Sequence, residues 1–139
     1  MVLDASIDLV FSLDSLVHVE SDVLGEYIWQ ICQKLTPTGV AFIHHSNALS
    51  PGCKMEEARN GARGETVSSA VVKQLVEDCS AVVRIQEEIP WVGPSRTDCF
   101  TLFGRATAFS DHRYMLLEND HFTTEIDLVQ RFQRHYGDI

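Results

Sequence analysis

Short apolar runs and stretches of helical periodicity alternate along most of the chain. Residues 6–11 form a β-prone apolar run with one aspartate near its start, which is typical of a buried parallel strand. In residues 22–35 the apolar side chains recur at helical spacing and form one face of an α-helix. Residues 36–39, Thr-Pro-Thr-Gly, predict the end of that helix, because proline cannot donate to it and glycine permits a left-handed exit. A second apolar run, residues 40–43, predicts a second strand.

These elements make a strand, helix and strand of about the minimum length for a parallel pair with a right-handed crossover. Residues 48–65 are polar and predict a long loop with room for a short helix at 55–59. The elements predicted next are a helix over 68–79, a strand over 81–89, a turn over 92–98 and a strand over 99–103 that is antiparallel to the one before it. Polar residues alternate with apolar ones in this strand, so one of its faces is expected to be solvated. We therefore expect the 81–89 strand to lie nearer an edge of the sheet than the two strands before it.

The pattern weakens towards the C-terminus. Residues 104–122 are irregular, and a final helix is expected from Thr123 or Thr124. Its expected buried stripe consists of Ile126, Val129, Phe132 and Tyr136. The predicted fold class is therefore α/β, with two parallel strands, a hairpin-like pair and helices on the faces of the sheet, in one domain over residues 1–139.

Composition and charge narrow the classes of function. The chain has 139 residues, 45% hydrophobic and 22% charged, which is typical of one soluble domain. Its net charge of -9 opposes binding to nucleic acid or an anionic membrane, because both attract clustered lysine and arginine. Residues 1–16 lack the basic start of a signal peptide, and no run approaches the ~20 apolar residues of a membrane span. The four cysteines form no Cys-x-x-Cys pair, so we expect a cytoplasmic protein with reduced thiols.

The sequence of the first two strands is the most distinctive part of the chain. Residues 7–19 read IDLVFSLDSLVHV, and LTPTGV follows the predicted helix at 35–40. These segments resemble the carboxyl-terminal half of the class I S-adenosylmethionine (SAM)-dependent methyltransferases. The resemblance covers residues 6–105 and implies strands four to seven of that Rossmann-like sheet, with the seventh antiparallel and inserted between the fifth and sixth.

Three segments resemble one bacterial subgroup of this family that is associated with sugar or glycan modification. They are FSLDSLVHV at 11–19, FIHHSN at 42–47 and QEEIPW at 86–91. The resemblance implies O-methylation of a small polar or sugar acceptor, with SAM as the methyl donor.

The family's glycine-rich cofactor loop has no counterpart in this chain. None of the eight glycines forms a Gly-x-Gly pair. We therefore expect a methyltransferase part that lacks the cofactor half, binds SAM weakly and is inactive by itself. Its first strand then offers an open edge for pairing with another chain. The alternative is a non-catalytic interaction or assembly module derived from such an enzyme.

Polar side chains follow the two strands that are expected to be parallel. Asp14 comes just past the first strand, and His44 and His45 end the second. Because imidazole is the natural base near neutral pH, we expect Asp14 and one of the two histidines to be catalytic. The acceptor-binding candidates are His18, Asn47 and Trp91, and the resemblance implies that Ser12 and Asp14 contact SAM.

Each assignment has a structural alternative. Asp14 can cap a helix or loop, His18 can make a structural hydrogen bond, and Trp91 can pack against the hairpin. A magnesium site is the weakest alternative, because its donors (Asp14, one of His44 and His45, and Asn47 or Asp98) show no diagnostic spacing. Arg59 and Arg63, in the long loop, are candidates for contact with an anionic substrate, but we expect both on the solvated surface.

Overall fold

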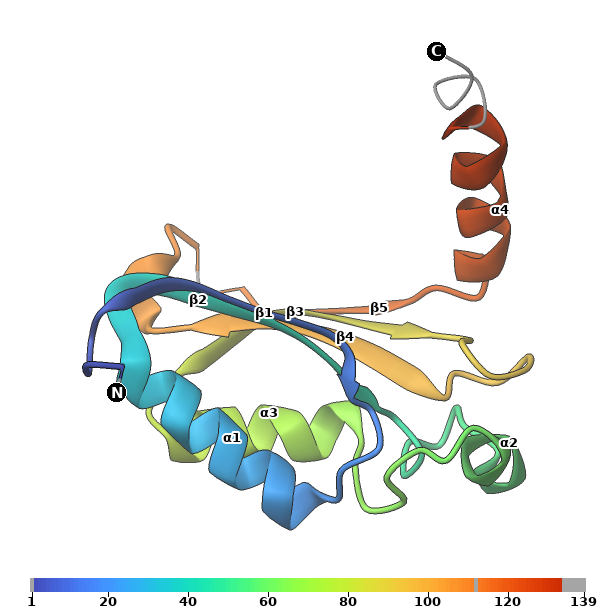
Figure 1. The fold of residues 1–139 in the computed structure, drawn as a ribbon, viewed down its shortest axis with the longest axis horizontal. Helices are drawn as coiled ribbons and strands as arrows, with labels where there is room; N and C mark the ends of the chain where they lie inside the picture. The colour runs from blue at the N-terminus through green and yellow to red at the C-terminus, as the bar shows by residue number, and fades with distance from the viewer. Residues whose placement is uncertain (1, 112, 134–139) are drawn as a thin grey trace.

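Residues 2–111 and 113–133 are described by a computed structural model, in which α1 and α3 cover one face of a five-stranded sheet (Figure 1). In chain order the elements are β1 (Ile7–Leu16), α1 (Ser21–Lys34), β2 (Leu35–Ser46), α2 (Met55–Asn60), α3 (Ser69–Asp78), β3 (Val82–Ile89), β4 (Asp98–Gly104), a 3₁₀ turn (Ala106–Ala108), β5 (Met115–Glu118) and α4 (Phe122–Gln133). The predicted α/β class is confirmed. No helix among these residues is long and apolar enough to cross a bilayer.

The strand order is β1-β2-β4-β3-β5. β1 and β2 are parallel, β4 runs antiparallel to β2 and β3 on its two sides, and β3 and β5 are parallel. The insertion of an antiparallel strand between β2 and β3 confirms the sheet that the resemblance implied. Two expectations were wrong: β3 is an interior strand, and residues 115–118 form β5 within the stretch expected to be irregular. β5 is only four residues long, which is too short for a strand period to show.

β1 and β2 contain irregularities that the sequence pattern placed outside the strands. Residue 7 of β1 pairs with residue 35 of β2, and residue 9 pairs with residue 40. Between these two pairs β1 has one residue, whereas β2 has the four residues 36–39. The Pro-Gly segment is therefore a bulge inside β2, not a turn that precedes it. At the second irregularity, residue 12 of β1 pairs with residue 43 of β2, and residue 16 pairs with residue 45, so the extra residues lie in β1. Asp14 is one of these extra residues and has a φ of 54°. Asp14 is thus part of β1, not a residue just past it.

The hydrophobic core lies between the sheet and the two helices α1 and α3. Leu24 and Ile28 of α1 and Val72 of α3 are fully buried against Ile43 and Phe103 of the sheet. These helical positions are the ones that the apolar periodicity selected, because residues three or four apart lie on one side of a helix. The core thus follows directly from the sequence pattern.

β1 is an edge strand, so the expectation of a buried strand was wrong. Val10 packs against the core, whereas Leu9 and Phe11 are 61% and 63% exposed on the other face. An apolar run in a sequence does not show whether both faces of its strand are covered.

Among residues 2–111 and 113–133, no helix packs along the opposite face of the sheet, and α4 stands away from that face (Figure 1). No residue of α4 is buried, and Val129 and Phe132 are 53% and 70% exposed. The expected buried stripe of this helix was therefore wrong for these residues. Tyr136 lies outside the described residues.

Candidate functional site

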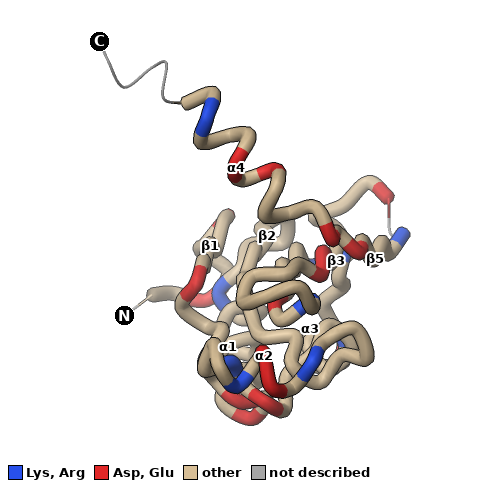
Figure 2. Tube along the Cα trace, turned by 90° about the vertical axis from the view of Figure 1, so that its right-hand side faces the viewer, with Lys and Arg blue, Asp and Glu red and all other residues tan. Residues whose placement is uncertain are grey.

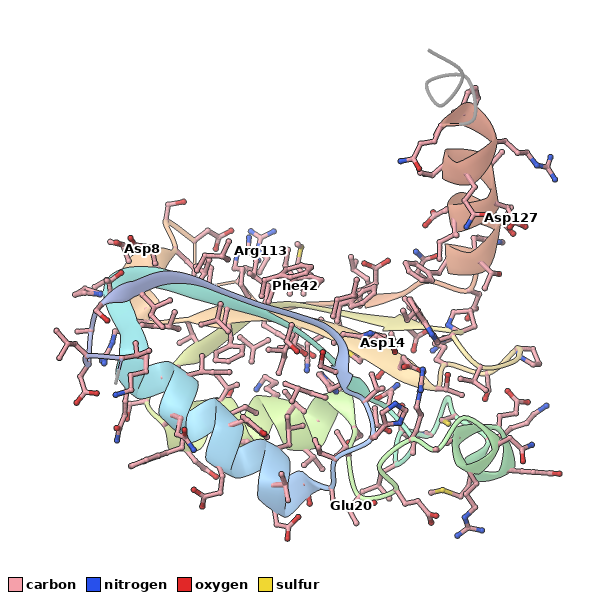
Figure 3. All side chains as sticks on the ribbon, viewed as in Figure 1. Asp8, Asp14, Glu20, Phe42, Arg113 and Asp127 are labelled. Carbon is pink, nitrogen blue, oxygen red and sulfur yellow. The ribbon has the colours of Figure 1, made fainter. Side chains whose placement is uncertain are left out.

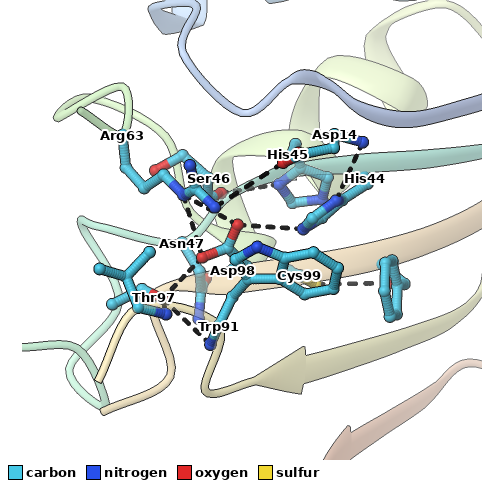
Figure 4. A network of polar contacts seen from close by, with 12 residues as sticks. Asp14, His44, His45, Ser46, Asn47, Arg63, Trp91, Thr97, Asp98 and Cys99 are labelled. Carbon is cyan, nitrogen blue, oxygen red and sulfur yellow. Dashed lines mark hydrogen bonds and ion pairs between the residues drawn. The ribbon is translucent and has the colours of Figure 1, made fainter. Parts of the chain in front are cut away.

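The carboxyl ends of β1 and β2 bring Asp14 and His44 together (Figure 4). The left-handed backbone of Asp14 turns its N–H towards the His44 ring, and this N–H donates to His44 Nδ1 at 3.1 Å. Nδ1 therefore carries no proton, and the ring proton lies on Nε2. His44 Nε2 is 3.0 Å from Asp98 Oδ1 in a close polar contact that does not have the geometry of a hydrogen bond. His44 is fully buried, and a protein group faces each of its ring nitrogens.

Asp98 is the centre of a buried charged network at the start of β4. Arg63 Nε lies 3.0 Å from its Oδ1, and the Thr97 hydroxyl donates to its Oδ2 at 2.6 Å. Burial by itself would raise the pKa of Asp98, but the contacts with His44, Thr97 and Arg63 together hold it below its ordinary value. The carboxylate therefore stays ionised although no part of its side chain is exposed.

Arg63 lies inside the structure, so its expected place on the solvated surface was wrong. Its side chain is only 5% exposed, and Nη2 also approaches Asp14 Oδ1 at 3.8 Å. Arg59, by contrast, forms an exposed ion pair with Glu65. Arg63 thus joins the long loop to both β1 and β4 through two carboxylates. The sequence signals neither the burial nor the pairing, since Arg63 and Asp98 are 35 residues apart.

His45 points to the other face of β2, because successive side chains of a strand alternate. Its Nδ1–H donates to the Ser46 carbonyl at 2.7 Å, and its Nε2 accepts from the Thr101 hydroxyl at 2.7 Å. Burial lowers the pKa of His45 to about 4. The ring is therefore neutral at pH 7. The catalytic roles expected for His44 and His45 stay predictions, but neither ring is open to solvent.

Asn47 and Trp91 lie near this network. Asn47 is fully buried: its side chain accepts from the Ser69 N–H at 2.9 Å and donates to the Arg96 carbonyl at 3.2 Å. It thereby ties the start of α3 to the chain before β4. The half-buried Trp91 ring packs against His44, with ring centroids 4.8 Å apart. Both positions fit the structural alternatives, and their acceptor-binding roles stay predictions.

His18 is the most accessible imidazole of the candidate site. It lies on the connection between β1 and α1, and its Nδ1 is 2.7 Å from the Ala62 carbonyl oxygen. A carbonyl oxygen only accepts, so the proton lies on Nδ1 and the lone pair on Nε2. In the neutral ring, Nε2 is then the nitrogen that can accept a proton from a substrate. Asp14, 55% exposed at its side chain, is the accessible carboxylate in the same part of the fold, and Ser12 is half-buried in β1.

Residues 61–66 pack against the connection that carries His18. The Gly64 N–H donates to the Val17 carbonyl at 3.0 Å, and a Cβ on Gly64 would lie 2.1 Å from the Val19 carbonyl oxygen. Only glycine allows this close approach. The Glu20 carboxylate accepts from the backbone N–H groups of residues 65 and 66. The long loop is therefore fixed against β1 and helps to position His18.

The residues present supply one side of a cofactor site at most. Asp14 and the exposed Leu13 are available at the carboxyl end of β1, but the chain has no Gly-x-Gly loop to approach a cofactor with its backbone. A hollow of about 430 Å³ lies between α1 and α3 and is lined by neither Asp14 nor His18. Within the described part of the chain, no three His, Cys, Asp or Glu side chains gather as metal ligands would.

The fold has known counterparts, although no family model and no curated protein sequence matches this chain. The structure of LepI in complex with SAM aligns over 70% of this chain with a TM-score of 0.50 and 13% sequence identity. A LepI variant in complex with SAH and substrate analogue aligns equally well. The fold of this chain is therefore similar to that of a part of the SAM-bound LepI structure. This chain spans only 26% of the LepI chain.

A third structure, the M1.HpyAVI–SAM complex, aligns over 82% of this chain and 56% of its own. Its TM-score is 0.36 at 13% identity, a likeness too weak to support an argument about the fold.

Proposed function

We propose that this chain forms the acceptor side of a SAM-dependent methyltransferase that acts on a small polar or sugar hydroxyl. The observation that carries the proposal is the likeness in fold to SAM-bound LepI, together with a sheet in which antiparallel β4 lies between β2 and β3 as the resemblance in sequence implied. In open α/β sheets, ligands bind beyond the carboxyl ends of the parallel strands. Asp14 near the end of β1 and His18 just after the strand are accessible polar groups at this edge.

His18 is proposed as the general base. Methyl transfer is an in-line displacement that needs an aligned and deprotonated acceptor, and SAM supplies the methyl group. The acceptor oxygen bonds to the methyl carbon, its proton passes to His18 Nε2, and the pair of the broken carbon–sulfur bond stays on sulfur. Asp14 lies beside the acceptor and donor. His44 is proposed as a positioning residue, because it holds the Asp14 backbone, and buried His45 and Asn47 support the strand end.

The cofactor loop is proposed to come from a separate segment that pairs with the free side of β1. β1 is the outer strand at its end of the sheet, and an unpaired strand edge offers N–H and C=O groups to another strand. The expected setting is the cytoplasm, with a small-molecule or sugar acceptor and neither nucleic acid nor membrane as partner.

The chain alone is expected to bind SAM weakly. Calorimetric titration of SAM into the folded 139-residue chain should give no submicromolar affinity, because the chain lacks the Gly-x-Gly backbone approach. Addition of the polypeptide encoded directly upstream should restore binding and methyl transfer. Submicromolar binding by this chain alone would refute the division into two parts.

Substitution of His18 by alanine is expected to reduce turnover of the restored enzyme by about 10²–10⁴-fold, the usual contribution of a general base. His121→Ala, which removes an exposed histidine at the far end of the described chain, serves as the control and should retain full turnover. Equal rates for the two variants would exclude His18 as the base.

A non-catalytic assembly module is the second candidate function. The burial of His44 and His45, each with both ring nitrogens facing protein groups, favours it, because a catalytic base must reach its substrate. A stable complex with the upstream polypeptide that neither binds SAM nor transfers methyl groups would support this candidate over the enzyme.

A further inference from the structure

The open face of the sheet carries a continuous row of aromatic side chains. Phe11 of β1 stacks on Phe42 of β2 with ring centroids 5.5 Å apart, and Phe42 contacts Phe100 of β4 at 5.3 Å. Leu9 and Leu13 extend the row along β1 and are 61% and 45% exposed. Figure 3 shows Phe42 on the side of the sheet opposite α1 and α3. A patch of this kind on a soluble protein marks an interaction surface.

α4 carries an apolar stripe that packs against this row at the N-terminal end of the helix, where the half-buried Ile126 lines a hollow with Pro90, Trp91 and Phe122. Phe122 packs against Trp91 at 5.8 Å and against Phe100 at 5.5 Å. Further along the helix, Leu128, Val129 and Phe132 are 47%, 53% and 70% exposed. Among the described residues, the helix and the open face are therefore two apolar surfaces that meet at the N-terminal end of α4 and carry exposed side chains beyond it.

The base of α4 is held so that the helix rises from the sheet. Asn119 N–H donates to the Glu88 carbonyl at 2.9 Å, which continues the pairing of β5 with β3. The Asn119 side-chain amide donates to Glu87 at 2.7 Å and to Glu125 at 2.9 Å, and its oxygen accepts from the His121 N–H. Figures 1 and 2 show α4 leaving the sheet in two perpendicular views. The stripe is therefore presented away from its own sheet.

The dimensions of the two surfaces match. A helix of 12 residues is about 18 Å long at ~1.5 Å per residue. Five strands spaced ~4.8 Å apart span about 19 Å between the outer two. One α4 laid across the open face therefore reaches from β5 to β1, where the most exposed apolar side chains lie.

We propose that two copies of this chain associate reciprocally, with α4 of each copy lying across the open sheet face of the other. A two-fold axis makes such an exchange self-complementary and closed. The contact between Phe122, Trp91 and Phe100 is the start of the interface, and the partner's helix continues it over Phe42 and Phe11. The inference uses neither the β1 edge nor methyl transfer, so it stands apart from the proposed function.

Light scattering coupled to size exclusion tests the association through Phe132→Asp on α4 and Phe11→Asp on the sheet. The wild-type chain is expected to be dimeric at micromolar concentration, and each variant to be monomeric. Gln130→Asp and Gln30→Asp add the same charge on another side of α4 and on α1, and should remain dimeric. Because both copies carry a charge of -9, added salt should strengthen the wild-type dimer. Far-UV circular dichroism checks that every variant is folded.

Mixing the two monomeric variants sharpens the test. The helix of the Phe11→Asp copy and the sheet of the Phe132→Asp copy are both intact, so one of the two contacts is restored. A dimer in the mixture, weaker than wild type but absent from either variant alone, supports the exchange. A monomeric wild-type chain overturns the proposed exchange. This holds even if hydrogen exchange shows that α4 is protected, because α4 then covers the sheet of its own copy. A dimer that survives both aspartate variants also overturns it.

Discussion

Replacement of Asp98 by alanine is expected to lower the free energy of unfolding by about 3–5 kcal/mol, the usual cost of removing one partner of a buried ion pair. Arg63 would keep its charge with a side chain that is 5% exposed, and only the more distant Asp14 would remain near it. His44 and Thr97 would also lose the carboxylate that they face. Urea denaturation followed by circular dichroism measures the loss.

An exposed ion pair on the same protein provides the control. Asp120 pairs with Arg96 at 2.8 Å, but its side chain is 62% exposed. Asp120→Ala should therefore cost less than about 1 kcal/mol. The combination of Asp98→Leu with Arg63→Met should be less destabilising than the sum of the two single changes, because it leaves no uncompensated charge. Equal effects of Asp98→Ala and Asp120→Ala would show that the buried network does not stabilise the fold.

Acidification from pH 6.5 to about 4 is expected to remove roughly 3 kcal/mol of stability through His45 alone. The pKa of His45 is lowered from 6.5 to about 4 in the folded protein, because burial opposes the charged ring. In that pH window the unfolded chain binds a proton that the folded chain does not, so stability falls as the pH falls. Asp98 affects stability at lower pH than His45 does. Its pKa in the folded protein is lowered from 3.8, so its contribution to stability is present above pH 3.8 and is lost as the pH falls through the pKa of the folded state.

His45→Gln isolates this effect, because glutamine retains a donor and an acceptor but does not titrate. Its unfolding free energy, measured by urea denaturation at successive pH values, should change much less between pH 6.5 and 4 than that of the wild type. His18→Gln removes an exposed histidine and should keep the wild-type slope. A wild-type stability that is constant across the window would contradict the burial of a neutral His45.

The helices and the sheet order were largely predictable. Leu24 and Ile28 recur at helical spacing, and only one side of α1 can then face the core. The order of the strands followed from the resemblance of residues 7–19 and 35–40, together with the closeness of β3 and β4 along the chain. β5 was missed because its four residues pair with β3 through backbone contacts that no short pattern shows.

The candidate site was predictable only in part. Asp14, His18 and His44 lie at one edge of the sheet because parallel strands end together. Their accessibility was not predictable: one residue of register decides that His44 and His45 point to opposite faces, and packing then buries both. Arg63 went unrecognised because its carboxylate partners come from distant parts of the chain.

The sequence by itself determined the α/β class, the position of α1 and the acidic character, since these depend on local periodicity and on counts of side chains. Only the tertiary structure decided that β1 is an edge strand, that one sheet face and α4 are uncovered, and that Asp98, Arg63 and His44 form a buried network. Burial and pairing are relations between segments far apart in the chain. Their free energies arise only when the packed structure excludes water from both partners at once.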